Sequence, residues 1–335
     1  TRGLGAAAGL PVGLGVAATG IISSAVVAKA FAGYLTTIIE LPERLVAMLV
    51  VVALGAVAWW GIKESVLLTA TVTILEVGTL MVVIFLGADL VTADVVADTI
   101  QIPDTAAASG VLTAAAVAFF AFIGFEDIAN MAEEAVEPRR TGPRAVAWTL
   151  VISMTVYVAL SLVAAGVEDR ASITESSAPL ADLFETVAGR EPTAVAAIAS
   201  LAMINGVLVQ IVMAARMLYG MAGERLLPTW LGAIDPRRHT PWRATGVVVC
   251  LILILVAGFP ILTLAKTTSF VVLAVFTLVN VALWRLARGH RPGTASAAGG
   301  EGGEDFGRGA LIGGIGALGS LLLWGWQLAD LLGWG

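Results

Sequence analysis

Nine apolar stretches, each about long enough to cross a bilayer, constrain this chain more than any other feature. A transmembrane helix needs about 20 apolar residues to cover the hydrocarbon core, which is roughly 30 Å thick. Of the 335 residues, 58% are hydrophobic and only 13% are charged. The sequence therefore predicts an all-α polytopic membrane protein in a lipid bilayer. The predicted spans cover residues 10–36, 43–60, 64–87, 110–136, 145–166, 193–222, 243–259, 262–284 and 309–327.

Lysine and arginine gather on alternate loops between these spans. The basic loops lie around residues 137–144, 223–242 and 285–308, and the loops on the other side carry few basic residues. Cytoplasmic loops of membrane proteins carry an excess of lysine and arginine. We therefore expect a multi-pass protein of the cytoplasmic (inner) membrane, with these three loops facing the cytoplasm.

Several kinds of chemistry find no support in the sequence. Cys250 is the only cysteine and lies inside a predicted span, while both histidines lie in loops, so no metal centre is expected. The sequence contains no motif of a serine hydrolase, a zinc protease or an ATP site. The formal net charge of −6 is spread over the loops, which argues against a nucleic acid partner. We expect neither an enzyme nor a cofactor.

The span from 110 to 136 breaks its own apolar pattern. Its apolar part runs from Val111 to Phe125 and is followed by Glu126 and Asp127. Because that part is too short to cross the bilayer, Glu126 is expected well inside the membrane, where a charge costs at least ~2.5 kcal/mol unless it faces protein or a wet cavity. Gly124, set among phenylalanines, is where the helix would break. The alternative is a kinked, continuous helix whose Glu126 bonds to a neighbouring helix.

Other spans also carry polar side chains at depth. Lys29 and Glu76 lie in parallel spans and would meet either as a structural ion pair or as a coupling site. Asn205 and Gln210 lie in the span 193–222, where they either bond between helices or line a pathway.

The predicted external loop between residues 172 and 189 has a helical repeat. Four apolar residues recur there at i, i+3, i+4 and i+7, beginning at Leu180. Ser177 is expected to cap this short helix, with Pro179 in its first turn. Two interpretations stay open: the helix lies on the protein as a lid over an external vestibule, or it rests on lipid headgroups.

Three segments resemble a known family. FFAFIGFEDIANMAEEAVEPRRTGPRAV, which begins at Phe119, resembles the sixth helix and following cytoplasmic loop of the amino acid, polyamine and organocation (APC) permease superfamily. INGVLVQIVMAARMLYGMAGERLLP, which begins at Ile204, resembles its eighth helix, and SSAPLADLF, which begins at Ser176, resembles its fourth external loop.

The resemblance implies a LeuT-like five-plus-five inverted-repeat transporter fold, in which helices one and six are unwound at the midplane. The nine spans would be helices three to eleven, so this chain would lack the first two helices of the family. The implied units are a remnant of the first repeat at 1–90, an external loop at 91–109, the second repeat at 110–288 with its first helix broken near 124, a cytoplasmic linker at 289–308 and an extra helix at 309–335.

The resemblance also implies a substrate site at the broken helix. Backbone carbonyls between Phe120 and Ile123 would receive the substrate amine, and Phe120 would be an aromatic gate. Glu126 matches a family acidic residue implicated in proton sensing, and Glu76 falls near a lysine that replaces a sodium ion in some relatives; with Lys29 they are the candidates for proton coupling. The implied substrate-binding residues are Phe119, Phe120, Ala121, Ile123, Gly124 and Phe125.

These features together predict secondary active transport of an amino acid, as symport with protons (or Na⁺) or as exchange. The apolar surroundings of Phe119, Phe120 and Phe125 favour a neutral substrate, although Glu126 and Asp127 would suit a cationic one. The alternative is a non-transporting membrane scaffold derived from a permease, because the glycine-rich half-site of the family's first helix does not occur in this chain. A membrane enzyme ranks last, for want of a catalytic constellation.

Overall fold

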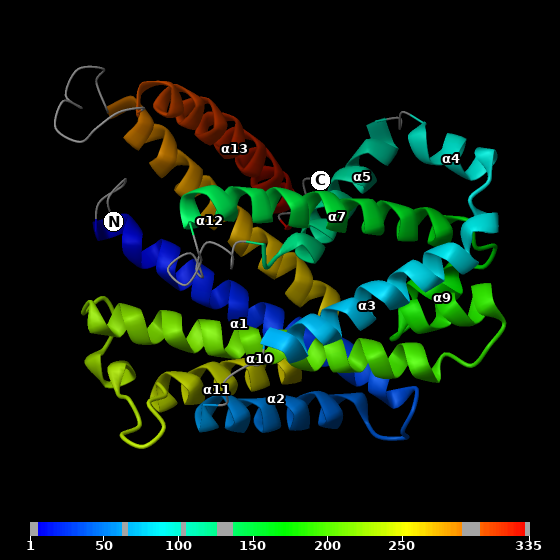
Figure 1. Ribbon diagram of the computed structural model, residues 1–335, viewed down its shortest axis with the longest axis horizontal. Helices are drawn as coiled ribbons and strands as arrows, with labels where there is room; N and C mark the ends of the chain where they lie inside the picture. The colour runs from blue at the N-terminus through cyan, green and yellow to red at the C-terminus, as the bar shows by residue number, and fades with distance from the viewer. Residues whose placement is uncertain (1–5, 62–65, 102–104, 126–136, 290–301, 332–335) are drawn as a thin grey trace.

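The computed structural model of the protein describes residues 6–61, 66–101, 105–125, 137–289 and 302–331, and all regular elements in these ranges are helical (Figure 1). The elements are α1 Ala6–Thr36, α2 Glu43–Trp60, α3 Val66–Leu86, η1 Ala88–Leu90, α4 Ala93–Ile100, α5 Thr105–Ala118, η2 Phe119–Phe122, α7 Pro138–Ala165, α8 Arg170–Thr174, α9 Pro179–Ala188, α10 Thr193–Gly223, η3 Thr229–Gly232, α11 Trp242–Gly258, α12 Ile261–Gly289 and α13 Gly302–Leu331.

Nine of these segments match the predicted spans in position. Six helices in the described chain are long and apolar enough to cross a membrane, namely α1, α2, α7, α10, α12 and α13. Three shorter apolar segments occupy the other predicted spans, at Ala70–Leu86, Ser109–Phe122 and Trp242–Gly258. Large apolar side chains cover much of the outer surface, such as Phe85, which is 80% exposed. An apolar exterior of this extent suits lipid, so the prediction of an all-α polytopic membrane protein is confirmed.

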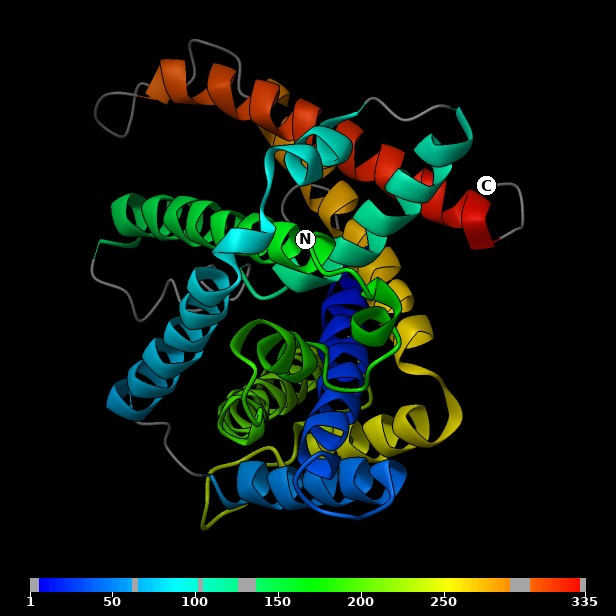
Figure 2. The ribbon, with the colours of Figure 1, turned by 90° about the vertical axis from the view of Figure 1, so that its right-hand side faces the viewer.

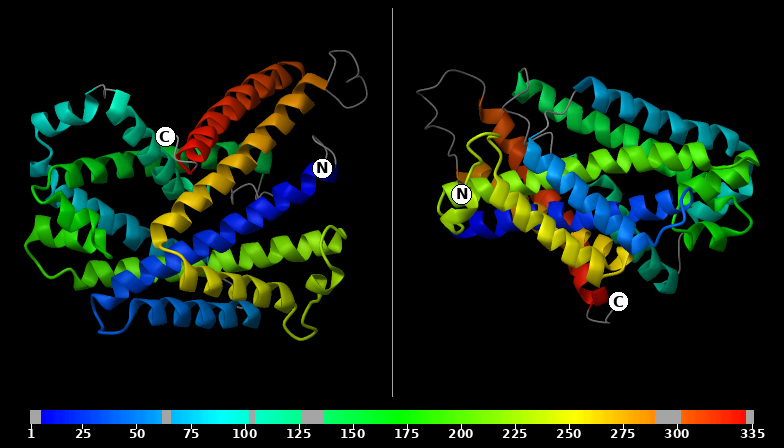
Figure 3. Two further views of the ribbon diagram at one scale, coloured as in Figure 1. Left: turned by 180° about the vertical axis from the view of Figure 1, so that it is seen from behind. Right: turned by 90° about the horizontal axis from the view of Figure 1, so that it is seen from below.

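Helix α1 lies at the centre of the largest core. It packs against α2, α10, α11 and α12, and Figure 2 shows α1 with α10 and α11 on two of its sides. The core between these helices contains Ile211 and Ile252, whose side chains are fully buried. Figure 3 shows α12 alongside α1, with α13 packed on α12.

Small residues let these helices approach closely. A Cβ added at Gly15 of α1 would overlap Val275 of α12, and one added at Gly55 of α2 would overlap Val249 of α11. In lipid, helices gain no hydrophobic driving force from pairing, so close van der Waals contact across small residues is what holds them together. Gly15 and Gly55 therefore lie where two helix faces approach most closely.

Helix α9, in the predicted external loop, packs on the protein. Its Ala181 and Leu183 are buried, and the N–H of Leu180 donates to the Tyr34 hydroxyl of α1 over 3.0 Å. The helix begins at Pro179 as expected, but the prediction that Ser177 caps it is wrong. Ala178 is the N-cap and provides no side-chain bond, while Ser176 Oγ accepts from the Ala178 N–H at 2.8 Å.

The loop from α10 to α11 is attached to the end of α2. The Arg238 guanidinium stacks over the rings of Trp59 and Trp60, with its carbon 4.3 and 3.9 Å from the two centroids. Thr240 Oγ1 donates to the Trp59 carbonyl at 2.8 Å. Figure 1 shows this loop at the same end of the molecule as the start of α7 and the end of α12. The cytoplasmic orientation of that end stays a prediction.

Asp235 makes the turn of this loop sensitive to acid. Its Oδ1 accepts from the backbone N–H groups of Arg237 at 2.8 Å and Arg238 at 3.0 Å, and these bonds lower the pKa of the carboxyl below its usual 3.8. The stabilisation is complete above that usual value and is lost as the pH falls through the lowered folded-state pKa. We expect hydrogen exchange at the two arginine amides to lose protection only in that acidic window. In Asp235→Asn, which does not titrate, this acid-dependent step should be absent, and an unchanged step would contradict the assignment.

Candidate functional site

The helix that begins at Thr105 ends in the middle of the predicted span 110–136. Helix α5 ends at Ala118 and passes into the 3₁₀ turn η2, after which Ile123 is extended, with φ −67° and ψ 135°. Gly124 then has φ +117°, in a region that residues with a side chain rarely adopt. Non-helical backbone at membrane depth exposes polar groups, which is tolerated only where they face protein or a wet cavity. Residues 119–125 are called the interruption below.

One ring of α12 contacts the interruption on both sides of the turn. The Phe276 ring lies 6.1 Å from that of Phe119, in an edge-to-face arrangement, and 5.6 Å from that of Phe125. Aromatic pairs in such geometries contribute about 0.5–1.5 kcal/mol each beyond the area they bury. Phe276 therefore holds the two ends of the interruption together.

Tyr157 of α7 contacts the turn itself. Its hydroxyl donates to the Ala121 carbonyl over 3.0 Å, and its ring lies edge-on to Phe122, with the centroids 5.3 Å apart. The Phe120 carbonyl accepts from the Ile123 N–H at 3.1 Å, as expected for a 3₁₀ turn. Two carbonyls of the turn therefore have a bonded partner. The Phe120 carbonyl accepts from within the turn, and the Ala121 carbonyl accepts from α7.

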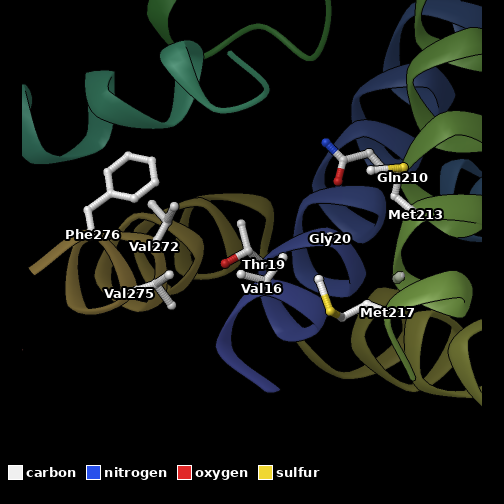
Figure 4. A pocket seen from close by; sticks show the side chains of 10 residues that line it. Val16, Thr19, Gly20, Gln210, Met213, Met217, Val272, Val275 and Phe276 are labelled. Atoms are coloured by element: carbon white, nitrogen blue, oxygen red, sulfur yellow. The ribbon is translucent and has the colours of Figure 1, made fainter. Parts of the chain in front are cut away.

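A cavity of about 50 Å³ lies between α1, α10 and α12, next to this arrangement. Figure 4 shows α1 between the two other helices, with Gln210 on the α10 side and Phe276 on the α12 side. Gly20 leaves room for Gln210, since a Cβ there would lie 3.3 Å from Gln210 Oε1. The lining residues are Val16, Thr19, Gly20, Gln210, Met213, Ala214, Met217, Val272, Val275 and Phe276.

The cavity lining is apolar apart from two neutral groups. Thr19 Oγ1 donates to the Gly15 carbonyl at 2.9 Å, which leaves the Gln210 amide as the main polar group available to a ligand. Within the described chain no charged side chain lines this cavity, and no group of three or more metal-ligating side chains is found. The site therefore suits a small, largely apolar ligand with few hydrogen-bonding groups.

Residues 4–328 of the chain match the amino acid permease family. The chain belongs to this family. The resemblance to the amino acid, polyamine and organocation superfamily noted in the sequence is thereby confirmed, and the match extends from before α1 into α13.

Three curated relatives of this chain are named as transporters or as a permease. An uncharacterised transporter of Mycobacterium tuberculosis is 34% identical over 241 residues, which are 70% of this chain and 53% of that protein. The branched-chain amino acid permease of Bacillus subtilis is 28% identical over 74% of this chain and 52% of its own length. The methylthioribose transporter of the same organism is 26% identical over 74% and 53%. The chain spans about half the length of these relatives.

The candidate residues of this chain do not all gather in one place. Phe119 and Phe125 meet at Phe276, Ala121 is bound by Tyr157, and Phe120 packs on the core that α1 and α10 share. Gln210 lines the cavity, whereas Asn205 of the same helix does not. Glu126 lies outside the described residues.

Lys29 and Glu76 do not form the predicted contact. Lys29 Nζ donates to the Val256 carbonyl of α11 at 3.2 Å and lines a second cavity, of about 340 Å³, with Glu43 and Arg44. Glu76 lies on α3, which packs against α7 and α10. The pairing prediction is wrong, because within the described residues α1 and α3 share little direct contact, and Lys29 bonds to α11 instead.

Sequence reasoning missed Phe276 and Tyr157. Both lie in apolar spans with no break, charge or motif around them, so neither position differs from a lipid-facing or core aromatic residue in the sequence. A weak signal exists in composition, since Tyr157 is one of only three tyrosines and lies in a span with no charged residue after Arg144. A buried tyrosine hydroxyl in a membrane requires a partner, and that requirement points to a polar site nearby.

Proposed function

We propose that the protein carries a neutral amino acid across the cytoplasmic membrane as a secondary transporter, with the substrate held between the interruption and the cavity of α1, α10 and α12. The observation that carries this proposal is the position of Phe276. Its ring lines the cavity and also contacts both ends of the interruption, so backbone carbonyls and an apolar pocket lie on either side of one side chain. An amino acid needs these two environments, because its ammonium seeks carbonyl oxygens and its side chain seeks apolar surface.

The charge of the lining supports a neutral substrate. A cationic side chain brought into this cavity would require a carboxylate partner, and the described lining residues include none. The Bacillus subtilis relative is named as a branched-chain amino acid permease, which agrees with an apolar substrate.

The cavity is too small for an amino acid in the present conformation. Ligand pockets are usually about 300–1,000 Å³, and this one is about 50 Å³. Transport therefore requires α12 or the interruption to move, and Gly124 at φ +117° lies where the backbone turns. This requirement suits alternating access, in which one helix bundle moves against another around a central site.

The coupling mechanism is proposed to be proton symport or exchange. Glu126 is the proposed proton acceptor, because its place in the sequence predicts a position inside the membrane, where a carboxylate binds protons more tightly. Glu76 is the second candidate, because it lies on α3, which packs against the helix that carries Tyr157.

The test is uptake of labelled amino acids by proteoliposomes containing the protein expressed from its natural coding sequence. We expect saturable uptake of leucine or a similar neutral amino acid, and little uptake of lysine. If neither transport nor binding of any amino acid is detected by uptake and by thermal shift, the proposal fails and the scaffold interpretation replaces it.

Phe120→Ala should raise the KM for the transported amino acid by roughly tenfold, which corresponds to about 1.4 kcal/mol of lost occlusion. The ring of Phe120 packs on the core formed by α1 and α10, next to the turn. Phe85→Ala is the matched control, because that ring is 80% exposed on α3. Equal KM and transport rate in Phe120→Ala and the unsubstituted protein would reject the gate.

A further inference from the structure

We propose that Tyr157 is a positioning residue for substrate recognition: by holding the Ala121 carbonyl from α7, it fixes the direction in which the interruption presents its acceptors to the substrate amine. This inference rests on the proposed function of the site. Tyr157 does not itself line the cavity, so its effect passes through the backbone of the turn.

Two independent contacts place Tyr157 on the turn. The hydroxyl donates to Ala121 O over 3.0 Å, and the ring meets Phe122 at 5.3 Å with an angle of 76° between the planes. Ala121 and Phe122 are consecutive residues of η2. A donor and a ring edge on adjacent residues restrain both the rotation and the translation of the turn.

These contacts matter because α7 packs little on the rest of the protein. Only 6% of the residues in its most apolar stretch are buried, and its main packing is against α3. Both contacts that the structure gives between α7 and the interruption come from Tyr157. From α12, Phe276 restrains the interruption at its two ends, through ring contacts with Phe119 and Phe125.

The chemistry of the carbonyl leaves a place for the substrate. A carbonyl oxygen has two lone pairs, and the Tyr157 hydroxyl occupies one of them. In this proposal a substrate ammonium binds through the second lone pair, from a direction that the first bond sets. A carbonyl of the interruption without this donor would be free to turn toward other partners, and the fraction of protein ready to bind the amine would fall.

The test compares Tyr157→Phe with Tyr219→Phe in proteoliposomes containing the protein from its natural coding sequence, with leucine as the probe. Tyr157→Phe removes the hydroxyl and keeps the ring. Tyr219 is the control. It lies on α10 outside the cavity lining, and its hydroxyl makes no hydrogen bond within the described part of the chain. We expect the KM to rise about three- to tenfold in Tyr157→Phe, the range of one ordinary hydrogen bond, with kcat changed less than twofold. Tyr219→Phe should match the unsubstituted protein.

A second measurement does not depend on transport. Hydrogen exchange of the amides of residues 119–125, without substrate, should be at least threefold faster in Tyr157→Phe and unchanged in Tyr219→Phe. If the unsubstituted protein transports leucine but Tyr157→Phe keeps its KM, the positioning role is wrong while the proposed function stands. A lower amount of folded protein at an unchanged KM would show a merely structural role and would also overturn the inference. If the unsubstituted protein neither binds nor transports an amino acid, the proposed function fails. In that case slower or unchanged exchange in Tyr157→Phe would also reject the restraint of Tyr157 on residues 119–125.

Discussion

Phe276→Ala should lower the affinity for the transported amino acid roughly tenfold to a hundredfold. The substitution removes two ring contacts, to Phe119 and Phe125, together worth about 1–3 kcal/mol. These contacts hold the two ends of the interruption in one arrangement, and affinity falls with the fraction of molecules in the binding-competent state. The ring is also part of the cavity wall, so its loss removes apolar contact with the substrate. Uptake kinetics and equilibrium binding of leucine measure the effect.

Phe270→Ala provides the matched control on the same helix. The Phe270 ring stacks on Trp324 of α13, with the centroids 5.1 Å apart, and does not line the cavity. It should weaken the packing of α13 while leaving the KM within about twofold of the unsubstituted value. If Phe270→Ala and Phe276→Ala raise the KM equally, the effect reflects general loosening of α12, and the role given to Phe276 is wrong.

Gly33→Ala should destabilise the protein by about 1–3 kcal/mol, the usual cost of overpacking. A Cβ at Gly33 would overlap the backbone carbonyl oxygen of Ser177, which leads into α9. Because a backbone group cannot rotate away as a flexible side chain does, the whole segment has to move. The displacement would also strain the bond between Tyr34 and the Leu180 N–H. A lower midpoint of thermal unfolding and faster hydrogen exchange across residues 178–188 are the expected readouts.

Gly220→Ala tests whether the effect of Gly33→Ala comes from contact or from helix propensity. Gly220 lies inside α10, and a Cβ there would have no atom within 4 Å. Alanine in an exposed helix interior is favoured over glycine by roughly 0.5–1 kcal/mol. We therefore expect Gly220→Ala to be neutral or slightly stabilising. An increase in stability for Gly33→Ala of the same size would show that α9 does not lie where the structure places it.

The positions of the helices could be read from the sequence because they follow from local properties. The span predicted at 43–60 coincides with α2. The span at 193–222 differs from α10 by one residue at one end, and the span at 243–259 differs from α11 by one residue at each end. The short helix in the external loop was also predictable, since Pro179 and a 3.6-residue apolar repeat mark it. Its cap was not, because Ser177 is suitable in type, whereas the backbone places Ala178 at the N-cap, where no side-chain bond is made.

The sequence alone determined that this chain is a bundle of membrane helices, because the bilayer acts on each apolar segment separately and its thickness sets the length each must have. It also singled out Gly124, because a glycine among phenylalanines in a span too short to cross is a local irregularity. Only the tertiary structure decided which side chains meet. Phe276 and Tyr157 reach the interruption, and Lys29 and Glu76 face different neighbours, because such contacts depend on how each helix is rotated and on which helices lie beside it. The rotation and the neighbours of each helix result from packing across the whole bundle, so they cannot be predicted from the sequence of one helix alone.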